Sequence, residues 1–347
     1  MFREANRVLA RQAGPSAAVL HLRVTNSFPC DPLKAFYSDQ FVLPLPSGHR
    51  FPMQKYRLLR ERATSVADKI SFCEAPTVTD GVLALAHEPA YIARVARGEL
   101  SDAEQKEIGF PWSPAMVERS RRSSGATIAA CRAALTDGVA LNLAGGTHHA
   151  HAAHGHGFCV FNDAAIAARL MQAERRVQRV AIVDLDVHQG DGSASILARD
   201  DSVFTLSLHG ERNYPFVKQI SDLDVALPDR TDDAAYLSAL ASALDTVFDR
   251  FAPQLVIFLA GADPHEGDRL GRLAMSKAGL AQRDRMVLQR AHAERIPVAI
   301  AMAGGYGRVI DDTVDIHLQT IAIAAEFAAQ WSTRSASPQY AQFSGSQ

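Results

Sequence analysis

The side chains best suited to chemistry are concentrated in one short segment, AGGTHHAHAAHGHGFC, at residues 144–159. Five of the thirteen histidines of the chain lie within nine residues of this segment. Glycines flank them, and because glycine interrupts regular helices and strands, we expect a loop. Imidazole is the side chain whose ordinary pKa suits proton transfer near neutral pH, and it also binds metal ions. The segment therefore indicates proton transfer, metal binding or both.

A second segment, VDLDVHQGDG at residues 183–192, places carboxylates and an imidazole at alternate positions. In an extended chain alternate side chains share one face, so Asp184, Asp186 and His188 are expected to point the same way. Asp263 follows another strongly apolar run and is the natural third metal ligand beside Asp186 and His188. Three protein ligands leave one coordination position open, which is typical of catalytic metal sites. Because the ligands are oxygen and nitrogen without sulfur, the pattern favours Zn²⁺, with Fe²⁺ as the alternative.

The adjacent pair His148 and His149 falls just past an expected strand end, where two imidazoles can reach a common metal-bound water from different directions. Each imidazole needs a partner that fixes its tautomer, and Asp184 and Asp191 are the carboxylates near the metal-ligand segment. Tyr306 lies in the sequence GGYG, where glycines let the backbone approach a ligand closely and the phenol can donate to a developing oxyanion.

Each of these features also has a simpler explanation. The aspartates of residues 183–192 could cap the following helix with His188 packed in the core, but Asp263 and the histidine segment make this the less favoured interpretation. Tyr306 taken alone could be an ordinary turn residue. The remaining histidines of the segment could chelate a metal, although a solvated loop rich in alanine, glycine and histidine is the commoner case. They are His151, His154 and His156.

The overall composition predicts a soluble globular protein and excludes several classes. Hydrophobic residues make up 47% of the chain and charged residues 21%, and the net charge of -2 argues against binding nucleic acid by phosphate neutralisation. No apolar run approaches the roughly 18 residues of a membrane span. The four cysteines are far apart and form no CxxC pair, which favours reduced thiols and a cytoplasmic location.

Short apolar runs alternate with amphipathic segments along the chain, and these elements must position the polar loops. The runs do not alternate in polarity, which is typical of strands covered on both faces of a parallel sheet. The fold class is therefore α/β, with three layers (α/β/α) and a mainly parallel sheet, and ligands are expected at the carboxyl ends of the strands. Strands are predicted at 138–145, 179–187, 202–209, 254–261 and 297–305, and helices at 114–135, 162–178, 233–251 and 276–294, the last with Ser276 as its N-cap.

The motifs GGTHHA, HGFCVFND, DLDVHQGDG, GAD and GGYG occur in the order in which they occur in the zinc-dependent histone deacetylase family. The chain resembles this family, which includes bacterial acetylpolyamine and acetoin-utilisation relatives, from about Tyr37 to Ile323. The sequences GDRLG and GGYGR look most like those of class IV members. The resemblance implies a single-domain arginase-like α/β fold. It also implies a deacetylase-like catalytic domain at 34–330, between a peripheral N-terminal extension at 1–33 and a flexible tail at 331–347.

The resemblance also assigns roles to individual residues. It implies paired catalytic histidines with orienting carboxylates, three metal ligands and an oxyanion donor. It further implies an acyl channel and a structural K⁺ site, and the stretch at 106–120 lacks the rim aspartate of class I members. The catalytic residues are His148, His149, Asp184, Asp191 and Tyr306; the metal ligands Asp186, His188 and Asp263; the channel residues Gly157, Phe158, Tyr214, Leu270 and Gly305; and the K⁺ residues Ser207 and Leu208 with Asp184, Asp186 and His188.

The expected function is metal-dependent removal of acyl groups from N-ε-acyl-lysine in proteins, including the long acyl chains that the class IV resemblance implies. One alternative is deacetylation of small amines such as polyamines. Another, from a different class, is a non-catalytic acyl-lysine-binding module, which is disfavoured because such a module needs neither Tyr306 nor both histidines. The sequence does not predict the oligomeric state.

Overall fold

The computed structural model describes residues 33–64 and 70–335 of the chain. The chain divides into Met1–Cys30, which lies outside the described residues, and one compact unit, Asp31–Gln347. The predicted N-terminal extension therefore lies outside the description except for Leu33, and the predicted C-terminal tail lies outside it from residue 336 onward. The last helix runs to Ser335, five residues past the predicted end of the catalytic domain.

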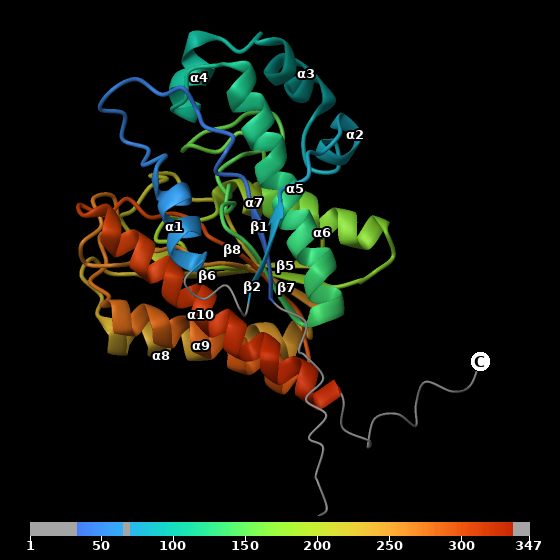
Figure 1. Ribbon diagram of the computed structural model, residues 1–347, viewed down its shortest axis with the longest axis vertical. Coiled ribbons are helices and arrows are strands. Elements are labelled where there is room, and N and C mark those ends of the chain that lie inside the picture. Colours follow the sequence, from blue (N-terminus) through green and yellow to red (C-terminus); the bar gives the residue numbers. More distant parts are fainter. Residues whose placement is uncertain (1–32, 65–69, 336–347) are drawn as a thin grey trace, which may run out of the picture. The chain divides into compact units, whose positions relative to one another are not determined.

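Eight parallel strands form the central sheet of the described chain, in the order β2-β1-β3-β8-β7-β4-β5-β6 (Figure 1). The predicted α/β class with a parallel sheet is confirmed. The strands are β1 Leu33–Tyr37, β2 Ile70–Glu74, β3 Val139–Asn142, β4 Val180–Asp184, β5 Val203–Gly210, β6 Leu223–Leu227, β7 Leu255–Leu259 and β8 Val298–Ala301.

Both faces of the sheet are buried, and alternate residues of one strand contribute to different cores. In β3, Val139 and Leu141 belong to one apolar cluster, whereas Ala140 belongs to the other. Helices α1, α8, α9 and α10 cover the first face, and α5 and α6 cover the second (Figure 1). Because helices cover both faces of the sheet, the central strands are apolar throughout and do not alternate in polarity.

The four predicted helices correspond to α5, α6, α8 and α9, of which α6 ends five residues before the predicted position, whereas α1, α2, α3, α4, α7 and α10 were not predicted. The predicted N-cap is confirmed at Ser276, whose side chain accepts from Gly279 N, and the Asn162 side chain caps α6 in the same way by accepting from Ala165 N. The helices are α1 Lys55–Ala63, α2 Asp80–Leu83, α3 Pro89–Arg97, α4 Asp102–Ile108, α5 Pro114–Asp137, α6 Asp163–Ala173, α7 Asp191–Leu197, α8 Asp233–Thr246 with the π-helical turn Val247–Phe251, α9 Lys277–Ala293 and α10 Ile310–Ser335.

Strands β1, β2 and β6 were not predicted, and their burial explains why. Strands β2 and β6 are the two edges of the sheet. Half-buried and exposed residues alternate along β6 up to its buried last residue, only Ile70 is buried in β2, and only Leu33 and Ala35 are buried in β1. The continuous apolar signal of a central strand is therefore absent from them. A second difference is that three central strands end earlier than predicted, because the chain leaves the sheet there to form the polar loops. Strand β4 ends at Asp184 and not at 187, β3 at Asn142 and not at 145, and β8 at Ala301 and not at 305.

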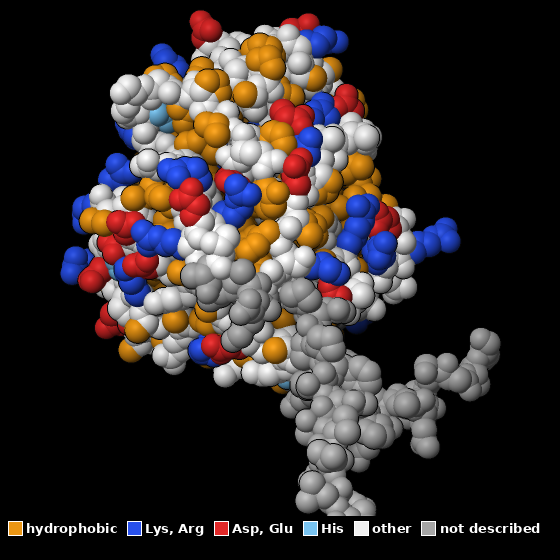
Figure 2. Space-filling view, in the orientation of Figure 1, with side chains coloured by type: hydrophobic (Ala, Val, Ile, Leu, Met, Phe, Trp, Pro, Cys, Tyr) orange, Lys and Arg blue, Asp and Glu red, His pale blue; other side chains and the backbone are white. Residues whose placement is uncertain are grey.

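The strand order brings the polar loops together. Strands β3, β8, β7 and β4 are neighbours, so the loops that follow their carboxyl ends lie side by side at one edge. These are the loops that carry the histidine segment, Tyr306, Asp263 and residues 185–190. On the face seen in Figure 2, positive and negative side chains are interspersed. No helix of the described chain is long and apolar enough to cross a membrane, and Cys73, Cys131 and Cys159 are free thiols.

Arg283 ties the helical layer to this edge of the sheet. Its fully buried side chain lies on α9, and Nη1 donates to Gly261 O at 2.6 Å and to Leu185 O at 3.3 Å. Its Nε donates to Asp284 Oδ1 at 2.9 Å, so a buried ion pair supports the backbone just after β4 and β7.

We predict that Arg283→Met lowers the free energy of unfolding by about 3–5 kcal/mol, because Asp284 stays buried without its partner. Urea unfolding followed by circular dichroism measures this loss. The matched control is Arg285→Met on the same helix, whose ion pair with Glu326 is exposed and contributes less than about 1 kcal/mol. Equal losses in the two variants would contradict the role assigned to Arg283.

Candidate active site

The loop after β3 is folded around one buried carboxylate, Asp163. Its Oδ1 accepts from Thr147 N at 2.8 Å, and its Oδ2 accepts from Gly146 N at 3.0 Å. Gly145 and Gly146 have φ values of +87° and +66°, which favour glycine. The carboxylate and the two glycines turn the chain so that His148 and His149 enter the interior, where both are almost fully buried.

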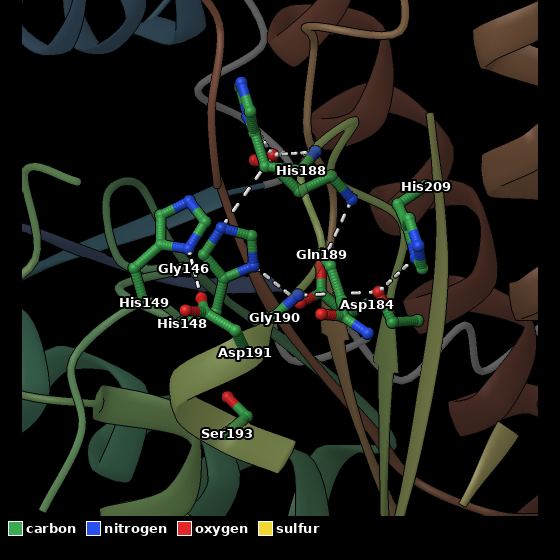
Figure 3. Close-up of polar contacts among 12 residues, drawn as sticks. Gly146, His148, His149, Asp184, His188, Gln189, Gly190, Asp191, Ser193 and His209 are labelled. Atoms are coloured by element: carbon green, nitrogen blue, oxygen red, sulfur yellow. Dashed lines mark hydrogen bonds and ion pairs between the residues drawn. The ribbon is translucent and has the colours of Figure 1, made fainter. Parts of the chain in front are cut away.

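Each histidine of the pair has its own carboxylate partner (Figure 3). His148 Nδ1 lies 2.6 Å from Asp184 Oδ2, and His149 Nδ1 lies 2.6 Å from Asp191 Oδ1. An Nδ1–H that donates to a carboxylate leaves Nε2 as the reactive nitrogen. The ring centroids of the two histidines are 4.2 Å apart, so both imidazoles can contact the same bound molecule.

The two imidazoles differ in protonation. Burial opposes protonation of His148, but the charges of Asp184 and Asp186 outweigh it and raise the pKa of His148 to about 9. Burial, together with the charge of His148, lowers the pKa of His149 to about 3. Near neutral pH the pair therefore consists of a cationic His148 and a neutral His149, which suits a fixed positive charge beside a proton acceptor.

Asp186, His188 and Asp263 form a compact buried group that could hold a metal ion. His188 Nδ1 lies 2.9 Å from Asp186 Oδ1 and 3.4 Å from Asp263 Oδ2. Asp263 Oδ2 is buried and has no hydrogen-bond partner in the described chain. Two buried carboxylates with an unpaired oxygen are costly without a cation, so the group fits a divalent metal. Asp184 is not part of the group because β4 ends there and its carboxylate pairs with His148.

Gly304 lets the tyrosine loop approach this group closely. Its N–H donates to Asp186 Oδ2 at 2.7 Å, and a Cβ at this position would overlap Asp263 Oδ2 and Asp186 Oδ2. Two residues later, Tyr306 N donates to Asp268 Oδ2 at 2.6 Å. Burial raises the pKa of the Tyr306 phenol well above its usual value, so the phenol stays protonated and can donate.

A cavity of about 830 Å³ leads to these residues. Its lining includes Gly157, Phe158, Tyr214 and Leu270, four of the five predicted channel residues. Gly305 does not line it, because its position faces the other way: an added Cβ would lie 2.6 Å from Thr313 Cγ2. The tyrosine loop contributes Gly304 and Tyr306 to the lining instead. The lining also includes buried residues from other segments, among them Leu43, Ile108, Arg119 and Phe161.

The residues predicted for K⁺ also lie together. Asp184 is paired with Ser207 across the β4–β5 ladder, and the Ser207 hydroxyl lies 3.0 Å from His209 Nδ1. Leu208 is fully buried, and Asp186 and His188 belong to the loop that directly follows β4.

Sequence reasoning missed two residues that support the site. Lys55 is buried at the start of α1, where Nζ donates to Ala303 O at 3.3 Å and to Gly305 O at 3.4 Å. Asp268 accepts from three backbone N–H groups, those of Tyr306, Leu270 and Gly271, and so joins two loops. Asp268 could have been found from the sequence because it is the aspartate of the GDRLG motif. Lys55 lies in no such motif and looks like an ordinary helix residue.

Comparisons with known proteins agree with this arrangement. Residues 49–321 match the family model described as histone deacetylase domain. An uncharacterized protein of Picosynechococcus sp. is 46% identical over 285 residues, covering 81% of this chain and 94% of that protein. Histone deacetylase 2 of Arabidopsis thaliana is 37% identical over 218 residues, which cover 61% of this chain and 54% of that protein. The fold matches the crystal structure of a histone deacetylase homologue from Aquifex aeolicus with a TM-score of 0.73 at 24% identity, covering 86% of this chain and 84% of that one.

We predict that Asp184→Asn lowers the pKa of His148 by at least about one unit in the metal-free protein. The substitution removes the nearest negative charge, so the protonated imidazole gives way to the neutral form at a lower pH. NMR titration of the ring nitrogens measures the change. Asp191→Asn, the same substitution beside His149, is the control and leaves the pKa of His148 nearly unchanged. An unshifted His148 in Asp184→Asn would show that Asp184 does not set its protonation.

Proposed function

Because the chain belongs to the histone deacetylase family, a family of amidohydrolases, we propose that it is a zinc-dependent hydrolase that removes acyl groups from the ε-amino group of lysine in proteins. The proposal rests on one observation above all. A neutral imidazole and a cationic imidazole lie side by side at the same cavity as a buried Asp–His–Asp group and a protonated phenol.

Asp186, His188 and Asp263 would hold the Zn²⁺ ion, with Fe²⁺ as the alternative metal. When bound, the metal supplies Lewis-acid polarisation of the acyl carbonyl and lowers the pKa of water. We assign a structural K⁺ ion to Asp184, Asp186, His188, Ser207 and Leu208, where the Asp184–Ser207 register of β4 and β5 supports the assignment.

His149 is the proton acceptor in this proposal. Its Nδ1–H is held by Asp191, so the neutral Nε2 takes the proton of the attacking water and later delivers a proton to the leaving amine. In the metal-free protein Asp184 helps to raise the pKa of His148, which favours a cationic imidazole, and we assign to it the stabilisation of the negative charge that develops on the substrate. Tyr306 donates a hydrogen bond to the oxygen of the tetrahedral intermediate, in a buried setting where such a bond is strong.

The charges at the cavity mouth favour an acylated protein over a small polyamine. The exposed charged residues of the lining are four cations and one carboxylate: Arg50, Lys106, Arg212, Arg272 and Glu107. A polyamine carries further positive charges and would be repelled by such a rim. The same rim disfavours strongly basic peptide flanks, so we propose that the acyl-lysine lies in a neutral or acidic sequence.

The non-catalytic alternative is a module that binds acyl-lysine without hydrolysing it. We predict that Tyr306→Phe lowers turnover by roughly 10²-fold or more while the affinity for a hydroxamate ligand changes little, because the phenol acts on the transition state. The control is Tyr37→Phe on β1, outside the cavity lining, which leaves turnover unchanged. Steady-state kinetics and calorimetry give the two quantities. Near-normal turnover in Tyr306→Phe would show that another group donates to the oxyanion. Absence of turnover by the parent protein on every acylated substrate would favour the binding module.

The second part of the proposal concerns the length of the acyl group. We propose that the protein belongs to class IV and prefers long fatty-acyl groups. The glycines around Tyr306 do not offer room for a long chain, because Gly304, Gly305 and Gly307 pack closely against Asp263, Thr313 and Val309. The cavity among the buried residues near Leu43 is the better place for extra methylenes.

We predict a higher kcat/KM for a myristoyl-lysine peptide than for the acetyl-lysine peptide of the same sequence. Each buried methylene contributes up to about 0.8 kcal/mol, so a few buried carbons raise specificity by roughly one to two orders of magnitude. Leu43→Trp, which adds bulk to the cavity lining, removes the preference while acetyl hydrolysis continues. Equal or faster hydrolysis of the acetyl peptide by the parent protein would refute the long-chain preference and leave the hydrolase assignment intact.

A further inference from the structure

Three histidines that the proposed reaction does not use lie together next to the catalytic loop. His151, His154 and His156 each offer a ring nitrogen, and the three nitrogens lie within 4.8 Å of one another. The rings of His151 and His154 are stacked, with centroids 4.6 Å apart, and the centroid of His156 is 5.1 Å from that of His151. None of the three lines the substrate cavity.

The backbone of this triad is fixed by hydrogen bonds. His151 N donates to His154 O at 2.9 Å, His87 Nδ1 lies 2.9 Å from His151 O, and Cys159 N donates to His156 O at 2.9 Å. The rings are therefore brought together by the fold of the loop and not by free chain motion, which reduces the entropy lost when a ligand binds.

We propose that His151, His154 and His156 form a second metal site, which takes a transition-metal dication such as Zn²⁺ and regulates the catalytic pair through Asp191. Imidazole is a preferred ligand for these ions, and three imidazoles leave coordination positions for water. His154 is exposed, so the site opens to solvent on one side. The Nε2 atom of His156 is buried, and its nearest charged neighbour is Asp191 Oδ2 at 3.0 Å, so a cation held by His156 would lie beside a carboxylate.

The geometry requires at most a small contraction. Ligand nitrogens about 2.1 Å from a tetrahedral Zn²⁺ are roughly 3.4 Å apart, and those of the triad already lie within 4.8 Å of one another. The exposed His154 side chain can supply such a movement by a rotamer change.

Asp191 connects the triad to catalysis. Its Oδ1 holds His149 Nδ1 at 2.6 Å, whereas its Oδ2 lies 3.2 Å from His151 Nε2 and 3.0 Å from His156 Nε2. A dication beside Oδ2 draws this carboxylate away from His149 and weakens His149 as a proton acceptor. The second site is therefore inhibitory when it is filled.

Equilibrium dialysis of the full-length protein against Zn²⁺, followed by elemental analysis, tests the site. We expect two ions per chain in the parent protein and one in His154→Gln. The matched control His292→Gln, the same substitution on α9, keeps two. Asp263→Ala keeps one ion, at the triad, and Asp263→Ala/His154→Gln keeps none. This binding measurement does not depend on the proposed activity, so its failure is distinct from failure of the hydrolase assignment.

A single ion in the parent protein, or two ions in a folded His154→Gln with an unchanged circular dichroism spectrum, overturns the second site. The regulatory part has its own test. Zn²⁺ at the concentration that fills the second site lowers turnover of the parent protein roughly 10-fold and leaves turnover of His154→Gln unchanged. Equal inhibition of the two proteins would overturn the link through Asp191.

Discussion

The burial of carboxylates at the carboxyl edge of one parallel sheet is the constraint on which the rest of the site depends. Asp184, Asp186, Asp191 and Asp263 are all buried within a few residues of a strand end. Each buried charge is costly unless it is paired. His148 pairs with Asp184 and His149 with Asp191, while the backbone N–H groups of Val187 and Gly304 donate to Asp263 and Asp186. Among the oxygens of these four carboxylates, only Asp263 Oδ2 accepts no hydrogen bond. A buried carboxylate oxygen without a hydrogen-bond donor favours a bound cation, and this makes the site a candidate for a metal.

The same pairing separates the chemistry of two neighbouring histidines. Each has a carboxylate at 2.6 Å, yet the pKa of His148 is raised and that of His149 is lowered. The negative charge of Asp186 also raises the pKa of His148. The positive charge of His148 in turn lowers the pKa of His149, because two neighbouring positive charges repel each other. Asp191, moreover, is shared with His151 and His156, so its charge is divided among several donors. The site thus acquires a fixed cation and a neutral base from two identical side chains, without any difference in the residues themselves.

Further contacts hold the loops in place from outside the cavity. Asp163 holds the loop after β3, Asp268 joins the Asp263 loop to Tyr306, and Arg283 holds the carbonyls of Leu185 and Gly261 from α9. These supports come from separate helices and loops, so the loops that follow β3, β4, β7 and β8 are held by hydrogen bonds from residues distant in sequence. The exposed charged residues of the cavity lining, by contrast, are four cations and one carboxylate.

The sequence by itself determined the wound α/β class, the central strands and their capped helices, and it grouped Asp186, His188 and Asp263 before their side chains were seen together. It could do so because buried parallel strands have a continuous apolar signal and polar motifs follow their ends. It could not predict the edge strands β2 and β6, which lack that signal, or the end of β4 at Asp184. Gly305 was expected in the channel but faces α10, and Lys55 was not recognised although it is buried beside Tyr306. Only the tertiary structure decided these points and the opposite protonation of His148 and His149, because burial and through-space charge depend on residues that are distant in sequence.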